Sequence, residues 1–237
     1  MKANALIFDY GGTLDTAGRH WGRMMERAYK EIGVDITPEQ FRETYVFTER
    51  RLGNQSLISP TYTFRQTLNL KLSLQIEYLV DHRMLQIPVA DRTALKRKML
   101  TMLYDDVVEC TRKSRKILAE LHAQCPLALV SNFYGNLSTV LQEFQLADFF
   151  KVVIESAEVG FRKPDPMIFR IALNALDCTA QQVAIIGDSY KNDIAPALQL
   201  DAKAIWLKGE GWHKEEEDET EKAIIIQNLS ELLTLRL

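Results

Sequence analysis

A few carboxylate side chains stand where they could do chemistry together. Asp9 follows the apolar run 5–8 and precedes Gly11, while Asp188 directly follows another apolar segment and lies five residues before Asp193. A carboxylate at the end of a buried strand, on a turn whose glycines permit unusual backbone angles, is well placed to act as a nucleophile. The other two carboxylates can meet one cation if a turn folds them together, and Mg²⁺ prefers oxygen ligands of this kind. The pattern predicts a nucleophile beside a metal ion.

A hydroxyl and an ammonium group complete the candidate chemistry. Ser131 follows the apolar run 127–130, a position where a serine more often caps a turn than binds a ligand. Lys163 stands before Pro164 and Pro166, whose rings restrict the local backbone. An ammonium group held in this way can neutralise anionic charge that develops during a reaction, which is a large effect where water is excluded. Lys163 is therefore a candidate for neutralising anionic charge during a reaction.

The elements that must position these residues are typical of an α/β fold. Short apolar runs at 5–8, 127–130, 183–186 and 204–207 predict buried parallel strands. Helical patterns at 137–144 and 193–200 follow two of them, as βαβ units require. Because ligands bind such sheets at the carboxyl ends of the strands, the residues that follow the strands are expected to share one site. A last edge strand at 223–226 and a closing helix at 229–235 are also expected.

The segment 16–107 has a different pattern. Amphipathic helices are expected at 21–32, 61–70 and 92–103, and no convincing strand lies among them. An insert of this length exceeds an ordinary loop, so it predicts a helical cap domain at 16–107 and a core domain at 1–15 and 108–237. A further helix at 112–123 would lead back to the sheet.

Composition limits the partners and the setting. A formal net charge of −3 gives no broad basic field, so nucleic acid is not an expected partner. The three cysteines, Cys110, Cys125 and Cys178, have no CxxC spacing and predict neither a disulfide framework nor a zinc site. No signal peptide or membrane span is expected, which favours a cytoplasmic setting. A monomer or homodimer is expected. The acidic run 215–221 is interpreted as a solvated loop.

Four motifs together resemble those of the haloacid dehalogenase superfamily, whose members are mostly Mg²⁺-dependent phosphatases. The motifs are Phe8-Asp9-Tyr10-Gly11-Gly12-Thr13-Leu14, Leu127-Ala128-Leu129-Val130-Ser131-Asn132, Gly160-Phe161-Arg162-Lys163-Pro164-Asp165-Pro166 and Gly187-Asp188-Ser189-Tyr190-Lys191-Asn192-Asp193. They occur in the family's order, and the helical insert lies between the first two, as in members with an α-helical cap. The resemblance implies a Rossmann-like parallel sheet flanked by helices, with an inserted helical cap.

The resemblance also implies roles for the site residues. Asp9 would be the nucleophile, assisted by Lys163 and Ser131. The substrate would be a small phosphorylated molecule, and the residues expected to contact it are Ser131, Asn132, Lys163 and Gly12. The Mg²⁺ ligands would be Asp9, the Gly11 carbonyl and Asp188, with Asp193 binding directly or through water. Asn192 is expected to cap the following helix.

One position departs from the family's pattern. Gly11 occupies the place where phosphatases of this superfamily carry a second aspartate, which protonates the leaving oxygen and activates water. General acid–base assistance is typically worth about 10²- to 10⁴-fold in rate. Three interpretations remain open: a slow or assisted phosphatase, a carbon-centred hydrolase of the dehalogenase or phosphonate-cleaving type, and a non-catalytic phosphate-binding module. The phosphonate-cleaving branch uses a cap lysine as a Schiff base, and the cap lysines, Lys30, Lys71, Lys96 and Lys98, lie in no recognisable motif. His20 is a weaker candidate for a replacement acid or base.

Overall fold

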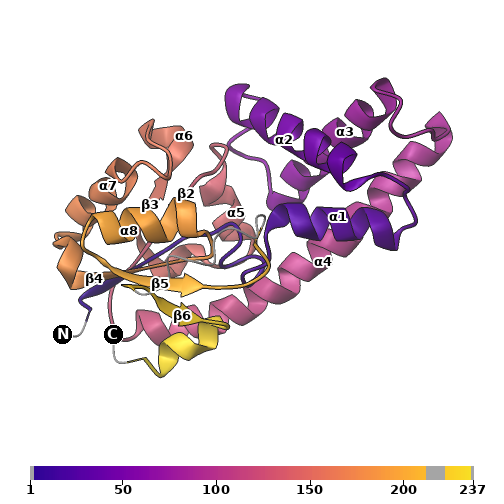
Figure 1. Ribbon diagram of the computed structural model, residues 1–237. Helices are drawn as coiled ribbons and strands as arrows, with labels where there is room; N and C mark the ends of the chain where they lie inside the picture. Colours follow the sequence, from indigo (N-terminus) through magenta and orange to yellow (C-terminus); the bar gives the residue numbers. More distant parts are fainter. Residues whose placement is uncertain (1–2, 212–221, 236–237) are drawn as a thin grey trace.

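A computed structural model describes residues 3–211 and 222–235 of the chain. The described residues form a six-stranded parallel sheet of order β3-β2-β1-β4-β5-β6, flanked by helices (Figure 1). The strands are β1 Ala5–Phe8, β2 Leu127–Ser131, β3 Phe150–Glu155, β4 Val183–Gly187, β5 Lys203–Leu207 and β6 Ile224–Ile226. The predicted Rossmann-like sheet is confirmed. The acidic run 215–221 lies outside the described residues.

β1 occupies the point where the strand order reverses. Phe8 pairs in register with Leu129 of β2 on one side and with Ile186 of β4 on the other. Alternate residues of β1 enter different cores, because successive side chains point to opposite faces of a sheet: Leu6 belongs to one buried cluster and Ile7 to the other. The ends of the three central strands therefore meet at one edge, which is where ligands bind open α/β sheets.

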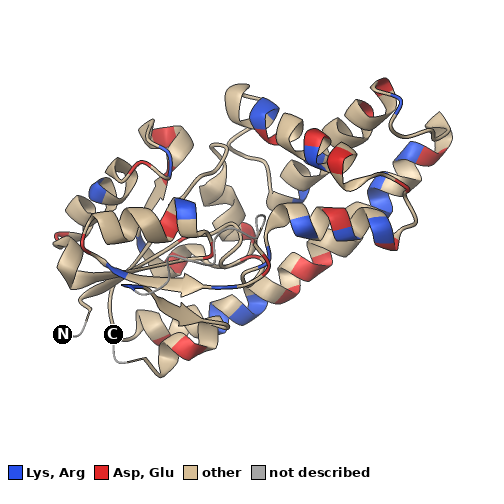
Figure 2. Ribbon diagram, in the orientation of Figure 1, with Lys and Arg blue, Asp and Glu red and all other residues tan. Residues whose placement is uncertain are grey.

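The helices form two groups (Figure 1). Their bounds are α1 Trp21–Glu31, α2 Pro38–Asn54, α3 Phe64–Asp81, α4 Val89–His122, α5 Leu137–Glu143, α6 Ser156–Val159, α7 Met167–Leu176 and α8 Ala195–Gln199. Helices α1, α2 and α3 and the beginning of α4 pack together to one side of the sheet. We call residues 21–107 the helical lobe. Figure 2 shows basic and acidic residues intermixed along the helices of this lobe.

Two helices of the lobe begin with capping boxes. The Thr37 hydroxyl accepts from the Gln40 amide and the Gln40 side chain accepts from the Thr37 amide; Thr63 and Gln66 repeat the arrangement at the start of α3. This motif satisfies two backbone donors that a helix start leaves without partners. α2 was not predicted, and α3 extends to Asp81, beyond the helix expected at 61–70, although the Thr-to-Gln spacings are present in the sequence.

α4 is one helix where two separate helices were predicted. Its buried side chains recur at intervals of three or four residues through the intervening segment, from Leu95 to Leu121, so one face remains covered throughout. The Ser114 hydroxyl donates to the Leu14 carbonyl at 2.7 Å, tying α4 to the loop that follows β1. The predicted boundary between residues 107 and 108 falls inside this helix, and the division into cap and core stays a prediction.

The ends of the sheet differ from expectation in small ways. β3 was not predicted; it pairs with β2 at the edge, and Lys151 in it is exposed, which breaks the apolar run. The expected closing helix is a 3₁₀ turn, Leu229–Leu233, after the expected edge strand β6. Among the described helices, none combines the length and apolar character needed to cross a membrane.

Candidate active site

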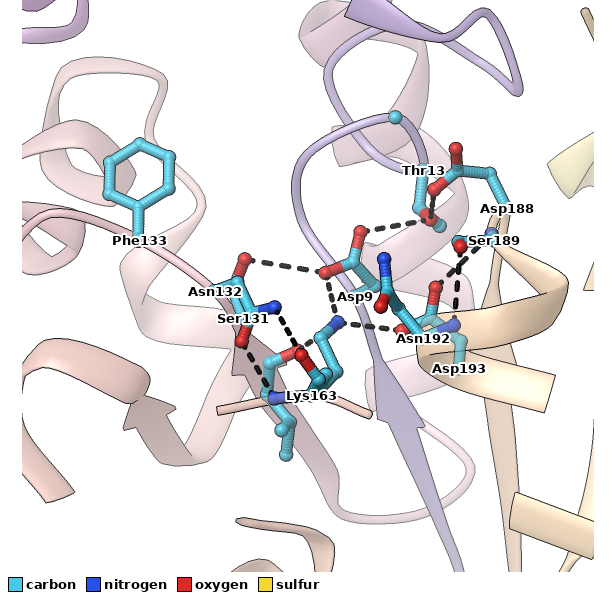
Figure 3. Close-up of polar contacts among 12 residues, drawn as sticks. Asp9, Thr13, Ser131, Asn132, Phe133, Lys163, Asp188, Ser189, Asn192 and Asp193 are labelled. Carbon is cyan, nitrogen blue, oxygen red and sulfur yellow. Dashed lines mark hydrogen bonds and ion pairs between the residues drawn. The ribbon is translucent and has the colours of Figure 1, made fainter. Parts of the chain in front are cut away.

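Asp9 lies at the centre of the site, at the carboxyl end of β1. The residue is 6% exposed, and its backbone amide donates to the Ile186 carbonyl of β4 at 2.9 Å. Asp9 Oδ1 accepts hydrogen bonds from Lys163 Nζ at 2.5 Å and from Ser131 Oγ at 3.3 Å (Figure 3). The structure thus brings both predicted partners onto one oxygen of the predicted nucleophile.

Thr13 was not predicted as a site residue. Its hydroxyl lies 3.3 Å from Asp9 Oδ2 and 3.1 Å from Asp188 Oδ1 (Figure 3). Because one hydroxyl has a single proton, it can donate to only one of these carboxylates at a time. Its position four residues after the nucleophile in a tight turn was the available signal.

Lys163 is a buried cation with every donor used. Its ammonium group donates to Asp9 Oδ1, to Asp193 Oδ1 at 2.6 Å and to the Val130 carbonyl at 3.1 Å. An ammonium group has three N–H donors, so these bonds fix its position. Burial alone would lower the pKa of Lys163, but Asp193 and Asp9 outweigh it and raise that pKa above its usual value. The side chain is therefore a permanent positive charge.

Asn132 holds the segment that carries Lys163. Its side-chain Nδ2 donates to the Lys163 carbonyl at 3.0 Å, and its Oδ1 accepts from the Lys163 amide at 2.9 Å. This pair of bonds joins the loop after β2 to the loop before α7. The arrangement uses both polar atoms of the side chain for positioning, and its predicted contact with substrate stays a prediction.

Three carboxylates gather beside this lysine. Oxygens of Asp9, Asp188 and Asp193 lie within 4.8 Å of one another. When all three are ionised, their negative charges exceed the one positive charge of Lys163 by two. Burial, followed by repulsion from Asp9 and Asp193, raises the pKa of Asp188 well above its usual value. Burial likewise raises the pKa of Asp193 to about 6. Clustered carboxylates of this kind, two buried and one half-buried, could hold a metal ion, because a cation would remove the imbalance.

Two glycines let these carboxylates approach the backbone. A Cβ on Gly12, whose φ is +100°, would overlap the carboxylate of Asp188, and a Cβ on Gly187 would overlap the side chain of Asp193. Gly11 differs, since a Cβ there would meet no atom within 4 Å and its φ is not in the left-handed region. Gly12 is required by its surroundings, whereas Gly11 leaves open space at the place of the missing acid.

The turn after β4 corrects one prediction. Ser189, and not Asn192, caps the helical turn Tyr190–Ile194, because the Ser189 hydroxyl accepts from the Asn192 amide at 3.2 Å. The Ser189 amide in turn donates to Asp193 Oδ2 at 3.2 Å. Asp193 therefore has one oxygen on Lys163 and the other on the backbone, an arrangement suited to an outer position around a metal.

A cavity of about 160 Å³ joins this site to the helical lobe. Its lining residues are Gly11, Gly12, Asp15, His20, Trp21, Tyr45, Glu49, Phe64, Thr67, Leu68, Lys71, Asn132, Phe133, Tyr134 and Asp188. A larger hollow of about 810 Å³ runs along α2 between Glu39 and Gln55, but no residue of the candidate site lines it.

Two titratable residues of the cavity already have structural partners. The buried Asp15 carboxylate accepts from the Gly12 amide at 2.7 Å and from Trp21 Nε1 at 2.9 Å, and burial raises its pKa to about 7. His20 caps α1, since its Nδ1 accepts from the Gly22 amide at 3.0 Å. Asp15 thus links the loop after β1 to the start of α1.

Comparisons with known proteins show the family and the fold of the chain. A family model described as haloacid dehalogenase-like hydrolase matches residues 6–207. A phosphoglycolate phosphatase of Vibrio cholerae is 30% identical over 83% of this chain and 81% of its own. The mouse haloacid dehalogenase-like hydrolase domain-containing protein 3 is 29% identical over 98% and 93%. The magnesium-bound protein YfnB of Bacillus subtilis has the same fold, with a TM-score of 0.59, 16% identity and coverage of 99% and 98%.

Proposed function

Because the chain belongs to the haloacid dehalogenase-like hydrolase family, we propose that it is a Mg²⁺-dependent phosphatase of a small phosphorylated metabolite. The observation that carries the proposal is the surplus of negative charge around Asp9. This carboxylate touches Lys163 and Ser131, and it shares its surroundings with the buried carboxylate of Asp193 and the half-buried carboxylate of Asp188, a group that calls for a cation. Phosphoryl transfer needs a nucleophile and strong charge neutralisation in one place.

The donor set fits Mg²⁺. We assign Asp9, Asp188 and the Gly11 backbone carbonyl as direct ligands, with Asp193 acting through water. Magnesium prefers oxygen ligands, keeps several waters and is often bound by one or two protein carboxylates. When bound, it would neutralise charge on the phosphoryl oxygens. The overlap that a Cβ on Gly12 would make with Asp188 supports the assignment, since it shows how closely this carboxylate approaches the loop.

In the proposed reaction, a carboxylate oxygen of Asp9 attacks phosphorus in line with the leaving oxygen. The bond to the leaving oxygen breaks as the Asp9–phosphorus bond forms, which leaves a phosphoaspartate and an alkoxide that takes a proton from water. Water then attacks phosphorus, and Asp9 leaves as the free carboxylate. Lys163 stabilises the charge throughout, while Ser131 and the Gly12 amide orient oxygens of the phosphoryl group.

Gly11 determines which esters react fastest. With no carboxyl group at this position, the leaving oxygen must be a weak base or be protonated by water. Acyl and aryl phosphates lose least from the missing acid, because their leaving groups need little protonation. We therefore expect slow turnover of alkyl esters relative to these activated ones.

The structure bears on the phosphonate-cleaving alternative through Lys71. Of the four lysines considered, Lys71 lines the cavity. Burial alone would lower the pKa of Lys71, but Glu49 and other neighbours raise it above its usual value. A Schiff-base lysine must lose its proton to attack a carbonyl, so an ammonium held by a carboxylate is poorly suited to that role. The cluster of Asp9, Asp188 and Asp193 disfavours a dehalogenase that works without a metal, because these carboxylates would repel one another without a cation between them.

The name of the Vibrio cholerae relative, a phosphoglycolate phosphatase, supports a small phosphorylated substrate. A cytoplasmic setting, and a monomeric or homodimeric state, stay predictions. The non-catalytic interpretation makes a distinct prediction, which is binding of phosphate or BeF₃⁻ in the presence of Mg²⁺ without release of product.

The test is phosphate release from acetyl phosphate and p-nitrophenyl phosphate, measured for the wild type and Asp9→Asn with Mg²⁺ and with a chelator. Turnover that requires both the metal and Asp9 supports the proposal. Asp9→Asn retains the shape of the side chain, so circular dichroism should show the same fold. Activity that survives either change would exclude the proposed mechanism.

A further inference from the structure

A second polar cluster lies across the cavity from the carboxylates. Lys71 on α3 places its ammonium group 2.7 Å from Glu49 Oε1 on α2 and donates to the Tyr134 hydroxyl at 3.0 Å. The Tyr134 hydroxyl donates to Glu49 Oε2 at 2.6 Å. We call these three residues the Lys71 cluster. They line the same cavity as Gly11 and Asp188, so one ligand could contact both sides.

We propose that the Lys71 cluster binds hydroxyl groups on the alcohol portion of the substrate. This inference rests on the proposed phosphatase function and names its substrate class, the phosphate ester of a short polyol or small sugar. Glu49 reaches the cavity from α2, Lys71 from α3 and Tyr134 from the loop after β2. The subsite is therefore complete only where the helical lobe meets the sheet.

The charge balance of the cluster favours hydroxyl groups over an anion. Lys71 and Glu49 carry one charge of each sign, in contrast to the surplus around Asp9. A carboxylate on the substrate would accept from Lys71 but would face Glu49 with like charge. A hydroxyl both donates and accepts, so adjacent hydroxyls can satisfy an ammonium and a carboxylate together.

Both charged groups retain capacity for a ligand. Lys71 is 8% exposed, and its ammonium has three N–H donors for the two contacts described. Glu49 Oε1 is buried, and no described residue gives it a well-aligned hydrogen bond, although Lys71 Nζ is 2.7 Å away. A carboxylate oxygen has more than one lone pair, so Glu49 Oε1 can accept a hydrogen bond from a ligand while it stays paired with Lys71. The oxygen thus points to a hydrogen-bond donor on the substrate.

The other walls suit a small organic group. Trp21 and Phe64 face each other with ring centroids 5.6 Å apart, and both line the cavity. The volume of about 160 Å³ is close to that of an engineered protein cavity that admits benzene. Aromatic faces with a few convergent polar groups are typical of small-molecule sites. The alcohol portion is therefore limited to a few carbon atoms.

The experiment compares three phosphate esters of equal chain length: glycerol 3-phosphate, propyl phosphate and 3-phosphooxypropanoate. We expect kcat/KM with Mg²⁺ for glycerol 3-phosphate to exceed that for propyl phosphate by at least about tenfold, because a site built for hydroxyls rejects ligands that lack them. Equal values for these two would overturn the inference. A preference for the carboxylate-bearing ester would also overturn it, in favour of an anion site.

Variants connect the preference to the cluster. The double variant Glu49→Gln with Lys71→Met removes both charges, so neither is left buried without its partner. We expect it to reduce the preference for glycerol 3-phosphate to less than about threefold, and Tyr134→Phe to reduce it by a smaller factor. Lys98→Met, on the exposed side of α4, is the matched control and should keep the wild-type preference. A double variant that keeps that preference would contradict the assignment.

Calorimetric titration of each ester into Asp9→Asn, in the presence of Mg²⁺, measures binding without turnover. Tighter binding of glycerol 3-phosphate than of propyl phosphate supports the subsite. If the wild type nevertheless releases no phosphate, only the proposed hydrolysis is overturned. Hydrolysis of all three esters at equal kcat/KM, with equal binding, would overturn the subsite while the proposed function stands.

Discussion

The described part of the chain buries two lysines beside acidic partners, and their surroundings differ in charge. Lys163 contacts two carboxylates and has a third nearby, which leaves a surplus of two negative charges. Lys71 has one carboxylate partner, and its charge is balanced. The comparison teaches that the charge count of a buried cluster, more than the presence of a lysine, indicates what the cluster will bind: a cation in one case, hydroxyl groups in the other.

The two clusters also differ in how they are built. Asp9, Lys163, Asp188 and Asp193 form what we call the Lys163 cluster. It stands on loops that leave one edge of a parallel sheet, whose strands fix it through backbone pairing. The Lys71 cluster is assembled from two helices and a loop, so its geometry depends on packing between the lobe and the sheet. Changes in the first should affect every substrate, and changes in the second should affect the choice among substrates.

The largest expected contrast comes from replacing each lysine by methionine. Lys163→Met should lower kcat/KM by about 10³-fold for every phosphate ester, because a fixed charge at the reacting group is lost. Lys71→Met, combined with Glu49→Gln so that no charge is left without its partner, should lower kcat/KM for glycerol 3-phosphate about tenfold and that for propyl phosphate less, since hydroxyl contacts are removed. Steady-state kinetics on both esters measures the contrast. If both variants lost activity equally on both esters, the distinction between the clusters would fail.

Gly11 and Gly12 offer the next contrast. Gly11→Asp should raise kcat for propyl phosphate by about 10²-fold, because a carboxyl group there can protonate the leaving oxygen and space exists for it. The gain with acetyl phosphate should be much smaller.

Gly12→Ala is the matched control, because its Cβ would overlap Asp188 at a backbone φ of +100°. It should lose activity on both substrates. A Gly11→Asp variant that is no faster on either substrate would show that the missing acid is not what limits the rate.

Metal binding should stabilise the protein through the Lys163 cluster alone. At about 100 times its Kd, Mg²⁺ should raise the free energy of unfolding by about 2.7 kcal/mol, or Tm by about 5–10 °C for a chain of this size. Asp188→Asn should abolish the shift in thermal unfolding, whereas Glu49→Gln should retain it. A shift lost equally in both variants would contradict the proposed location of the metal.

The last prediction concerns Asp15, which lines the cavity. Burial raises its folded-state pKa from 3.8 to about 7, so the folded state holds a proton that the unfolded state has released over this range. Its contribution to stability should therefore fall as pH rises from about 4 to about 7, by at most about 1.4 kcal/mol per pH unit.

Asp15→Asn cannot ionise and keeps every other titratable group. Urea titrations at several pH values measure the free energy of unfolding of both proteins. As pH rises, this free energy should decrease for the wild type relative to the variant. Parallel pH curves for the two proteins would show that Asp15 has the same pKa folded and unfolded.

The sequence was sufficient to predict the core of the site. Asp9, Ser131 and Asp188 follow strands, and the carboxyl ends of parallel strands meet at one edge. Lys163 and Asp193 joined them as the motif resemblance implied. These residues are close to strand ends, so pattern and order along the chain determine where they meet.

The cavity wall could not be predicted in the same way. Glu49, Lys71 and Tyr134 come from three elements whose meeting depends on how the helical lobe packs, and no local pattern encodes that packing. β3 was missed because Lys151 interrupts its apolar run, and α2 because its hydrophobic face is narrow, with only four buried residues in seventeen. Thr13 has no distinguishing feature beyond its place in the turn.

The continuous α4 helix has a mechanical consequence. With 34 residues and a rise of about 1.5 Å per residue, it is a rod of about 51 Å that begins in the helical lobe and ends beside the sheet. A rod transmits rotation along its axis, and one residue added to an α-helix advances its phase by about 100°. A single alanine inserted near the middle of α4 would therefore rotate the lobe by about 100° relative to the sheet. This rotation would carry Lys71 away from Asp188 without altering any residue of either cluster.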